Sequence, residues 1–394
     1  MIFTVRAKIW KSALPNICDE SKLAARIAGL RYGDRTSEMI GTGEPWQFPL
    51  TKPHRLEPGD IVAVVSPCWG GPSIFPHRYL AGKDYLTTAF DLEVVEMPNA
   101  LRPPSWLERN PQARAEDLHE AFENPRIKAI IASIGGDDAI RLIPHVDLSV
   151  LARNPKILLG YSDVTVLHFG CLKAGLGSFY GPTIMSGFAE NCGMHGFAEN
   201  SIRKTIFDPR VVGKIPRNNE GWTVERLDWA NPDLQARRRK LTPCKGPRIV
   251  QGRGRVSGHL IGGCSESLEM LKASDWWPPP TIWDGSIFFY ETSEEGPPPA
   301  QLLRWLRNFG VQGLLSRISA FVFGRPGGQI SVASHMEYER VILQALAEFG
   351  ATEIPVMVDM DFGHTDPIMT LPYGAMAEID CERSAFSILE SAVI

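Results

Sequence analysis

The sequence has no long hydrophobic run and no sign of a secretory leader. Crossing a bilayer takes about 18–20 consecutive apolar residues, and no run in the 394 residues approaches this length. The N-terminal residues also lack the apolar core and the small-residue cleavage site of a signal peptide. We therefore expect a cytoplasmic protein without a membrane span.

An excess of one charge and a paired set of cysteines are lacking as well. The 41 basic residues are balanced by 45 acidic residues, for a net charge of −4, so no positive field favours nucleic acid as a partner. The seven cysteines are an odd number, are widely spaced and include no CxxC pair. Disulfide frameworks and zinc sites depend on such pairs, so the sequence predicts free thiols and no metal site.

What is present is a chain of two-domain length with strongly apolar segments. At about 100–200 residues per domain, 394 residues with 44% hydrophobic content predict two packed domains. Continuous apolar runs at residues 61–65 and 157–159 and the largely apolar segment 128–134 are typical of strands buried on both faces. A helix that begins near Pro111 separates the first two runs. This alternation predicts an α/β fold with a parallel sheet.

The sequence pattern divides the chain into four segments. Residues 1–49 form an N-terminal arm of unassigned structure, and residues 50–214 form the α/β domain. The apolar runs then give way to Asn, Pro, Arg and Trp, so residues 215–254 are interpreted as an interdomain linker. Further apolar runs predict a second domain over residues 255–394.

One turn between a strand and a helix is a candidate nucleophile site. Ser162 follows the strand that ends at Gly160, and an apolar helix begins shortly after it. A serine at such a turn exposes its hydroxyl beside the amides of a helix N-terminus, which is the geometry of a nucleophile elbow. The local pattern is G-x-S-D rather than G-x-S-x-G, and an N-cap serine explains the same residue. The turn alone leaves both interpretations open.

A pair of glycines, Gly135 and Gly136, ends the neighbouring strand and is followed by Asp137 and Asp138. Glycines there let backbone N–H groups approach a ligand, as an oxyanion hole or a phosphate site requires. A tight turn before a helix is the alternative. The motif is similar to the GGDD turn of phosphofructokinase-like kinases, so a phosphotransferase that uses a nucleotide and Mg²⁺ is a second hypothesis. A non-catalytic nucleotide-binding module is a third.

A serine nucleophile needs a histidine base that a carboxylate orients. Among nine histidines, His364 lies in a loop after an apolar strand, between Gly363 and Pro367. Sites on parallel sheets gather at such strand ends. Glu291 directly follows the apolar run 287–290 and is the candidate carboxylate, and a plain strand terminus explains it equally well. Spacing alone does not bring Ser162, Glu291 and His364 together.

Short motifs in both predicted domains, in a fixed order, resemble the LD-carboxypeptidase and microcin C immunity family of serine peptidases. The resemblance covers roughly residues 50–394. Its carriers are Glu57-Pro58-Gly59-Asp60-Ile61, Val64-Val65-Ser66-Pro67, Ser133-Ile134-Gly135-Gly136, Asn154-Pro155-Lys156, Gly160-Tyr161-Ser162-Asp163, Tyr180-Gly181-Pro182, Gly258-His259-Leu260-Ile261-Gly262-Gly263, Glu291, Gly363-His364-Thr365, Pro367 and Leu371-Pro372.

The resemblance implies a Ser–Glu–His triad, with Ser162 as nucleophile, His364 as general base and then acid, and Glu291 orienting the imidazole. It assigns the oxyanion hole to the backbone amides of Gly136 and Asp163. It also implies a smaller, strand-rich C-terminal domain, a site in the groove between the domains, a homodimer, and no metal or organic cofactor. The expected reaction is cleavage of an amide in an L,D-peptide or in a peptidyl- or aminoacyl-nucleotide, through an acyl-enzyme.

Other residues favour the microcin-immunity branch of the family. Ile134 precedes the glycine pair, where LD-carboxypeptidases usually have an arginine. Trp222 and Trp229 resemble linker tryptophans of that branch, and an aromatic face holds a nucleotide base; plain packing is the alternative. Arg325 departs from that branch, because immunity proteins carry an acidic residue in the loop after the strand 321–323. We therefore expect Arg325 to meet a substrate carboxylate or phosphate.

Overall fold

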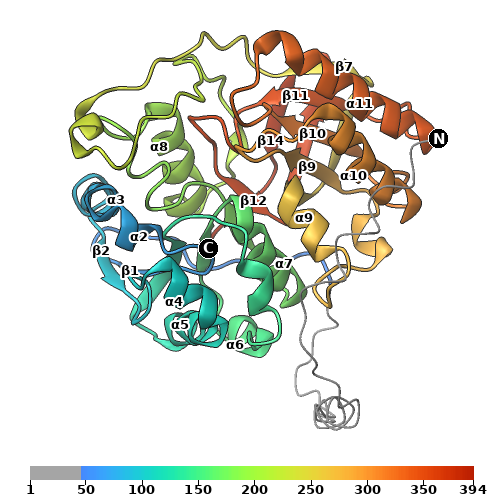
Figure 1. Ribbon diagram of the computed structural model, residues 1–394. Helices are drawn as coiled ribbons and strands as arrows, with labels where there is room; N and C mark the ends of the chain where they lie inside the picture. Colours follow the sequence, from blue (N-terminus) through green and yellow to red (C-terminus); the bar gives the residue numbers. More distant parts are fainter. Residues whose placement is uncertain (1–45) are drawn as a thin grey trace, which may run out of the picture. The chain divides into compact units, whose positions relative to one another are not determined.

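The computed structural model describes residues 46–394, which contain two β-sheets and the helices that pack on them (Figure 1). The strands are β1 (Ile61–Val65), β2 (Glu93–Glu96), β3 (Ile127–Ala132), β4 (Ile157–Gly160), β5 (Ser178–Tyr180), β6 (Gly213–Lys214), β7 (Arg248–Gln251), β8 (Arg255–Cys264), β9 (Ile287–Glu291), β10 (Ala320–Gly324), β11 (Val356–Met360), β12 (Leu371–Tyr373), β13 (Met376–Asp380) and β14 (Ala385–Ile388). The α-helices are α2 (Gly71–Ile74), α3 (Pro76–Phe90), α4 (Pro104–Arg109), α5 (Pro111–Glu123), α6 (Leu148–Arg153), α7 (Thr165–Lys173), α8 (Gly196–Ile202), α9 (Ser265–Leu271), α10 (Pro299–Val311) and α11 (His335–Glu348).

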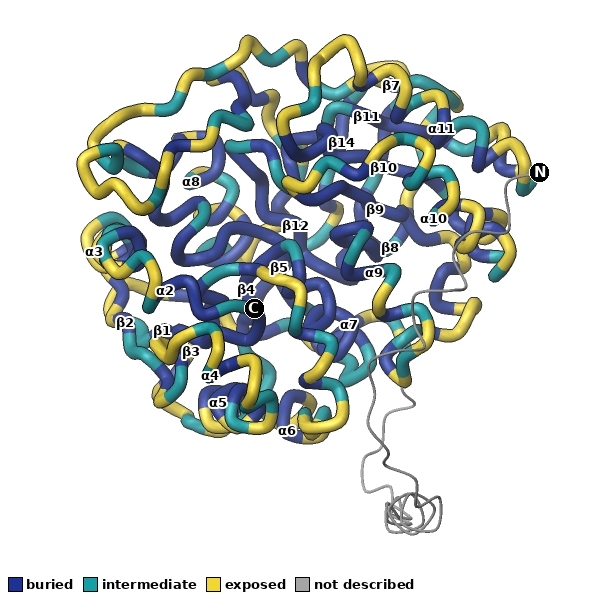
Figure 2. The backbone as a smooth tube through the Cα atoms, viewed as in Figure 1, coloured by how far each residue is buried: buried dark blue, intermediate teal, exposed yellow. Residues whose placement is uncertain are grey.

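The first sheet has six strands in the order β12-β5-β4-β3-β1-β2. Strands β1 to β5 run parallel to one another, β12 pairs antiparallel with β5, and α3, α5 and α7 pack against the parallel strands. The central strands β1, β3 and β4 are almost entirely buried, as Figure 2 shows. Burial on both faces follows from the uninterrupted apolar runs of these strands. The predicted α/β fold is confirmed.

The second sheet has eight strands in the order β6-β14-β13-β8-β9-β10-β11-β7. Its centre, from β8 to β11, is parallel, and antiparallel strands complete both edges. Strands β9 and β10 are fully buried, and α10 packs against α11 beside them (Figure 1). The strand-rich second half that the family resemblance implies is therefore present.

Three strands belong to a sheet that another segment of the sequence mainly forms. Strand β12, from the C-terminal segment, pairs with β5 and completes the first sheet, with Leu371 opposite Tyr180. Strands β6 and β7, which precede the C-terminal segment, both belong to the second sheet. As a result, each sheet contains strands from both sides of the predicted segment limits.

The sequence also predicts an N-terminal arm and the absence of a membrane span. Residues 1–45 of the predicted N-terminal arm lie outside the described residues. Within residues 46–394, no helix combines the length and the apolar character that a membrane crossing requires.

Glycine is required at position 262, where β8 approaches β9 most closely. A Cβ added to Gly262 would stand 1.7 Å from the carbonyl oxygen of Phe289, its partner in the parallel register. We expect Gly262→Ala to force these strands apart and to lower the free energy of unfolding by about 1–3 kcal/mol, measured by denaturant titration. Gly177→Ala is the control, because its added Cβ would have no neighbour closer than 3.5 Å. An equal loss in both variants would contradict the steric argument.

Candidate active site

Ser162 lies on a sharp turn between β4 and α7. The turn is a short 3₁₀ segment, η2 (Ser162–Val164), whose N-cap residue is Tyr161 and which has no side-chain capping bond. Ser162 has a φ of +62°, which is an uncommon, strained conformation for a residue with a side chain. A Cβ at Gly135 would stand 2.9 Å from the Cβ of Ser162, so the neighbouring strand end must be glycine. This is the backbone of a nucleophile elbow and not an N-cap serine.

Side chains from the two sheets meet at this turn. The Nε2 atom of His364 lies 3.0 Å from the Oγ atom of Ser162. The Nδ1 atom of the same ring lies 2.7 Å from a carboxylate oxygen of Glu291, which is fully buried at the end of β9. Gly363 precedes the histidine with a φ of +92°, and a Cβ there would stand 2.6 Å from the carboxylate. The three residues of the predicted triad are therefore hydrogen-bonded in the order that nucleophilic catalysis requires.

Tyr180, at the end of β5, forms hydrogen bonds to two residues of the predicted triad. Its hydroxyl donates a 2.5 Å hydrogen bond to Glu291 and accepts one of 3.2 Å from the backbone N–H of Ser162. Burial raises the pKa of this hydroxyl, so it stays protonated and keeps donating. No role for Tyr180 was predicted from the sequence, where its only signal is its place in the family motif Tyr180-Gly181-Pro182.

Carboxylates surround the imidazole of His364. Burial lowers the pKa of His364, but Glu291, Glu294 and Glu266 raise it, and the net pKa is about 9. Glu294, in the loop after β9, is a second carboxylate in contact with the ring, with an oxygen 3.2 Å from Nε2. The ring is thus held between two acids, and sequence reasoning missed Glu294.

The turn after Gly136 is hydrogen-bonded to the nucleophile elbow that contains Ser162. The buried carboxylate of Asp163 accepts hydrogen bonds from the backbone N–H groups of Asp138 and Ala139, at 2.9 and 2.8 Å. Burial raises the pKa of Asp163 to about 6. Asp138 is itself paired with the buried Arg114 at 2.6 Å. Because these carboxylates already hold the turn together, the hypothesis that the GGDD turn seats a nucleotide phosphate with Mg²⁺ is not favoured.

A cavity of about 770 Å³ opens beside the triad. Residues of both sheets line it, including Gly136 and Ser162 from the first half and Cys264 and His364 from the second. The amides of Gly136 and Asp163 donate to no group within residues 46–394, so both remain available for an oxyanion. The site thus lies between the two halves of the chain, as the family resemblance implies.

The structure brings one of the three predicted substrate-binding residues to this cavity. Trp229 lines it, with Arg78 over one face at 4.2 Å from the ring centroid. Arg325 is 3% exposed and forms an ion pair with Asp361 at 2.6 Å. Trp222 is 7% exposed and packs near Arg325. Neither Arg325 nor Trp222 lines the cavity, so the expectation that they touch substrate is corrected: the guanidinium is occupied by Asp361, and the indole packs in the interior.

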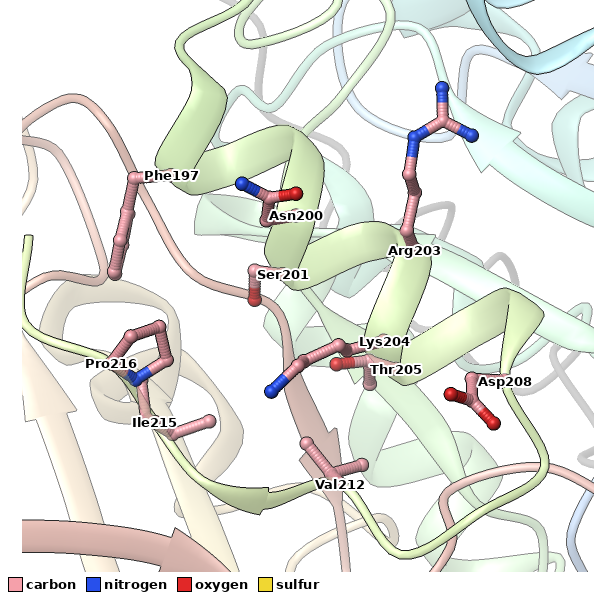
Figure 3. A pocket seen from close by; sticks show the side chains of 10 residues that line it. All are labelled: Phe197, Asn200, Ser201, Arg203, Lys204, Thr205, Asp208, Val212, Ile215 and Pro216. Carbon is pink, nitrogen blue, oxygen red and sulfur yellow. The ribbon is translucent and has the colours of Figure 1, made fainter.

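A second cavity, of about 350 Å³, lies between α8 and residues 212–216 (Figure 3). In Figure 3 the amine of Lys204 points into it, while the guanidinium of Arg203 points away. Its lining contains two hydroxyl residues, Ser201 and Thr205, but no histidine or cysteine. A hydroxyl–imidazole pair therefore occurs at the larger cavity and not at this one.

One group of residues within 46–394 could hold a metal ion, with donor atoms of Cys264, Glu291 and His364 within 4.8 Å of one another. Two of its members are the hydrogen-bonded acid and base of the triad. The donor set therefore coincides with the triad.

Comparison with known proteins agrees with this division of the site. Residues 62–181 match the LD-carboxypeptidase N-terminal domain, and residues 257–379 match the LD-carboxypeptidase C-terminal domain. Ser162 lies in the first match, and Glu291 and His364 lie in the second.

Individual relatives cover most of the chain. It is 31% identical over 278 residues to the microcin C7 self-immunity protein MccF of Escherichia coli, covering 70% of this chain and 78% of that protein. It is 27% identical over 339 residues to a Vibrio cholerae protein named as a carboxypeptidase, covering 84% and 96%. A solved structure of MccF in complex with aspartyl sulfamoyl adenosine superposes with a TM-score of 0.78 at 26% identity, covering 87% of this chain and 100% of that chain. The chain belongs to the LD-carboxypeptidase and microcin immunity family of serine peptidases.

Proposed function

We propose that this chain hydrolyses an amide bond through an acyl-enzyme on Ser162, with His364 as base and acid and Glu291 orienting the imidazole. The observation that carries the proposal is the continuous hydrogen-bonded series from Ser162 through His364 to Glu291, with distances of 3.0 and 2.7 Å. It joins side chains from both halves of the chain beside one cavity.

The two halves of the reaction use the same imidazole. His364 takes the Oγ proton as Ser162 attacks the substrate carbonyl, and the backbone N–H groups of Gly136 and Asp163 donate hydrogen bonds to the oxyanion. The imidazolium then donates that proton to the leaving nitrogen, so the amine departs and the acyl group stays on Ser162. Water next loses a proton to His364 and attacks the ester, and His364 returns this proton to Oγ of Ser162 as the acid leaves.

The proposed substrate is an aminoacyl or peptidyl group in amide linkage to a nucleotide. Trp229 presents an aromatic ring in the cavity wall, and aromatic faces hold bases without reading their sequence. A relative in this family has been solved with aspartyl sulfamoyl adenosine. The cavity of about 770 Å³ is of a size that suits a nucleoside with an attached amino acid.

The test is turnover followed by mass spectrometry on two substrates, an L,D-tetrapeptide and an aminoacyl sulfamoyl adenosine. We expect release of the amino acid from the nucleoside compound, with no need for ATP and no effect of EDTA. Release of D-alanine from the tetrapeptide alone would replace the nucleotide by a murein-type peptide as substrate. Activity that requires ATP and Mg²⁺ would contradict the hydrolase and restore the phosphotransferase hypothesis.

The variant Trp229→Ala tests whether the base of the substrate stacks on the Trp229 ring. Stacking on an aromatic side chain contributes about 1–3 kcal/mol per base, so we expect KM for the aminoacyl sulfamoyl adenosine to rise roughly 10- to 100-fold with little change in kcat. Trp229→Phe keeps an aromatic ring, so its KM should lie between that of the unsubstituted protein and that of Trp229→Ala. A substrate without a base should show no change in KM, and an equal rise for both substrates would contradict stacking.

The proposal also includes a cytoplasmic location and a homodimeric assembly. The six cysteines within residues 46–394 are free thiols, which supports the cytoplasm as the compartment. The family resemblance supports a homodimer. Light scattering of the purified protein would test the assembly directly.

A further inference from the structure

Glu294 places a carboxylate at the point where the substrate is attacked. Its Oε2 atom lies 3.2 Å from Nε2 of His364, and this same nitrogen faces Oγ of Ser162 at 3.0 Å. The carboxylate is therefore within two hydrogen-bond lengths of the nucleophile. The Glu294 side chain is 50% exposed and lines the cavity, so it is accessible to a bound molecule.

Apart from His364, no strong partner within residues 46–394 occupies this carboxylate. Among these described residues, its one other ion pair is with Arg226, at 3.7 Å, and both side chains are half exposed or more. Such surface pairs contribute little and are easily exchanged. The other cationic side chains of the cavity already have partners: Arg78 bonds to Asn191 and Gln235, and Arg239 bonds to Glu190 and Asp366.

We propose that Glu294 recognises a free ammonium group on the acyl residue of the substrate, beside the carbonyl that Ser162 attacks. This inference rests on the proposed function, because it assumes that an acyl group is delivered to Ser162. The ammonium of an aminoacyl group lies two bonds from the reacting carbonyl carbon, which matches the short separation between Glu294 and Ser162. A charge-assisted hydrogen bond of this kind is about twice as strong as a neutral one.

The same carboxylate would select against other acyl groups. An acylated amine cannot donate with a positive charge, and an acidic group at this position would be repelled. The neighbouring carboxylate of Glu266 is already hydrogen-bonded to Ser265 and Ser293, so of these two acids Glu294 is the one with a free face. An ammonium bound to Glu294 would also take the carboxylate from Nε2 of His364 and leave that nitrogen to the serine.

Binding of two matched ligands tests this assignment without requiring turnover. The ligands are L-alanyl sulfamoyl adenosine and its N-acetyl form, and the full-length protein carries Ser162→Ala so that neither ligand is cleaved. By calorimetry we expect the ammonium form to bind at least about 10-fold more tightly than the acetyl form. Adding Glu294→Gln should bring the two affinities within about 2-fold by weakening the ammonium form alone. Glu295→Gln is the matched control, because Glu295 lines the same cavity without an ion pair to His364, and it should keep the preference.

The outcomes separate this inference from the proposed function. Equal affinities before the Glu294 change, equal loss of both ligands after it, or binding of neither would overturn the role of Glu294. Turnover by the unsubstituted protein is measured separately on the same ligands. A protein that binds the ammonium form selectively but cleaves nothing would retract the hydrolase and retain this inference.

Discussion

Replacing Ser162 with alanine is expected to lower kcat by about 10⁴- to 10⁶-fold, the range seen when a triad nucleophile is removed. The Oγ atom is the only group at this site that forms the bond to the acyl carbon in the proposed mechanism, and it lies 3.0 Å from the base. Substrate affinity should change little, because the cavity wall and the oxyanion amides are untouched. Single-turnover rates by mass spectrometry and calorimetric affinities measure the two effects separately.

Ser186→Ala is the matched control for Ser162→Ala. Its hydroxyl lines the same cavity and is bonded to the Tyr161 hydroxyl at 2.7 Å, not to His364. Its activity should stay within a few-fold of that of the unsubstituted protein. A fluorophosphonate probe should add one mass increment to the unsubstituted chain and to Ser186→Ala, but none to Ser162→Ala. Near-normal turnover by Ser162→Ala would refute the acyl-enzyme.

The sequence predicts those parts of the fold that carry a local signal. The apolar runs at 61–65 and 157–159 became β1 and β4, because a strand buried on both faces has to be apolar throughout. The placement of β12 has no such signal. Three residues near the C-terminus pair with β5, almost two hundred positions earlier, and pairing at that separation depends on the tertiary fold. The same holds for β7, which lies in the predicted linker and joins the edge of the second sheet.

The site also contains residues with a local sequence signal and features that depend on the tertiary fold. Ser162, Glu291 and His364 could be proposed because each follows an apolar strand, where a parallel sheet places its functional groups. Their distances could not be derived, since they depend on how β4 and β9 pack. Arg325 was assigned to substrate from its place after the strand 321–323, and its ion pair with Asp361, thirty-six residues later, has no local signal. Glu294 was missed, although acids in the loop that follows a parallel strand are close to the signal that identified Glu291.

Glu291→Gln is expected to lower kcat by about 10⁴-fold, as loss of the orienting carboxylate does in other triads. The buried carboxylate accepts a hydrogen bond from Nδ1–H of His364 and one from the Tyr180 hydroxyl. A glutamine amide keeps the shape but offers an NH₂ group as readily as an oxygen. The imidazole then loses its fixed tautomer, and the imidazolium formed during the attack loses its counter-charge. Steady-state kinetics on the aminoacyl sulfamoyl adenosine measures the loss.

The pH profile of the same variant separates this effect from a simple loss of fold. Only neutral His364 can take the Oγ proton, and its pKa in the free protein is about 9. The kcat/KM of the unsubstituted protein should therefore rise with pH, about tenfold per unit, up to roughly pH 9. Glu291 is the first of the groups that raise this pKa, and Glu294 and Glu266 are the others, so Glu291→Gln should move the rise to lower pH while the maximum falls. Tyr180→Phe removes a hydrogen bond but no charge, and it should lower the rate without an equal shift in the midpoint. If Glu291→Gln left the midpoint near pH 9, Glu291 would not be the group that sets the charge of the base.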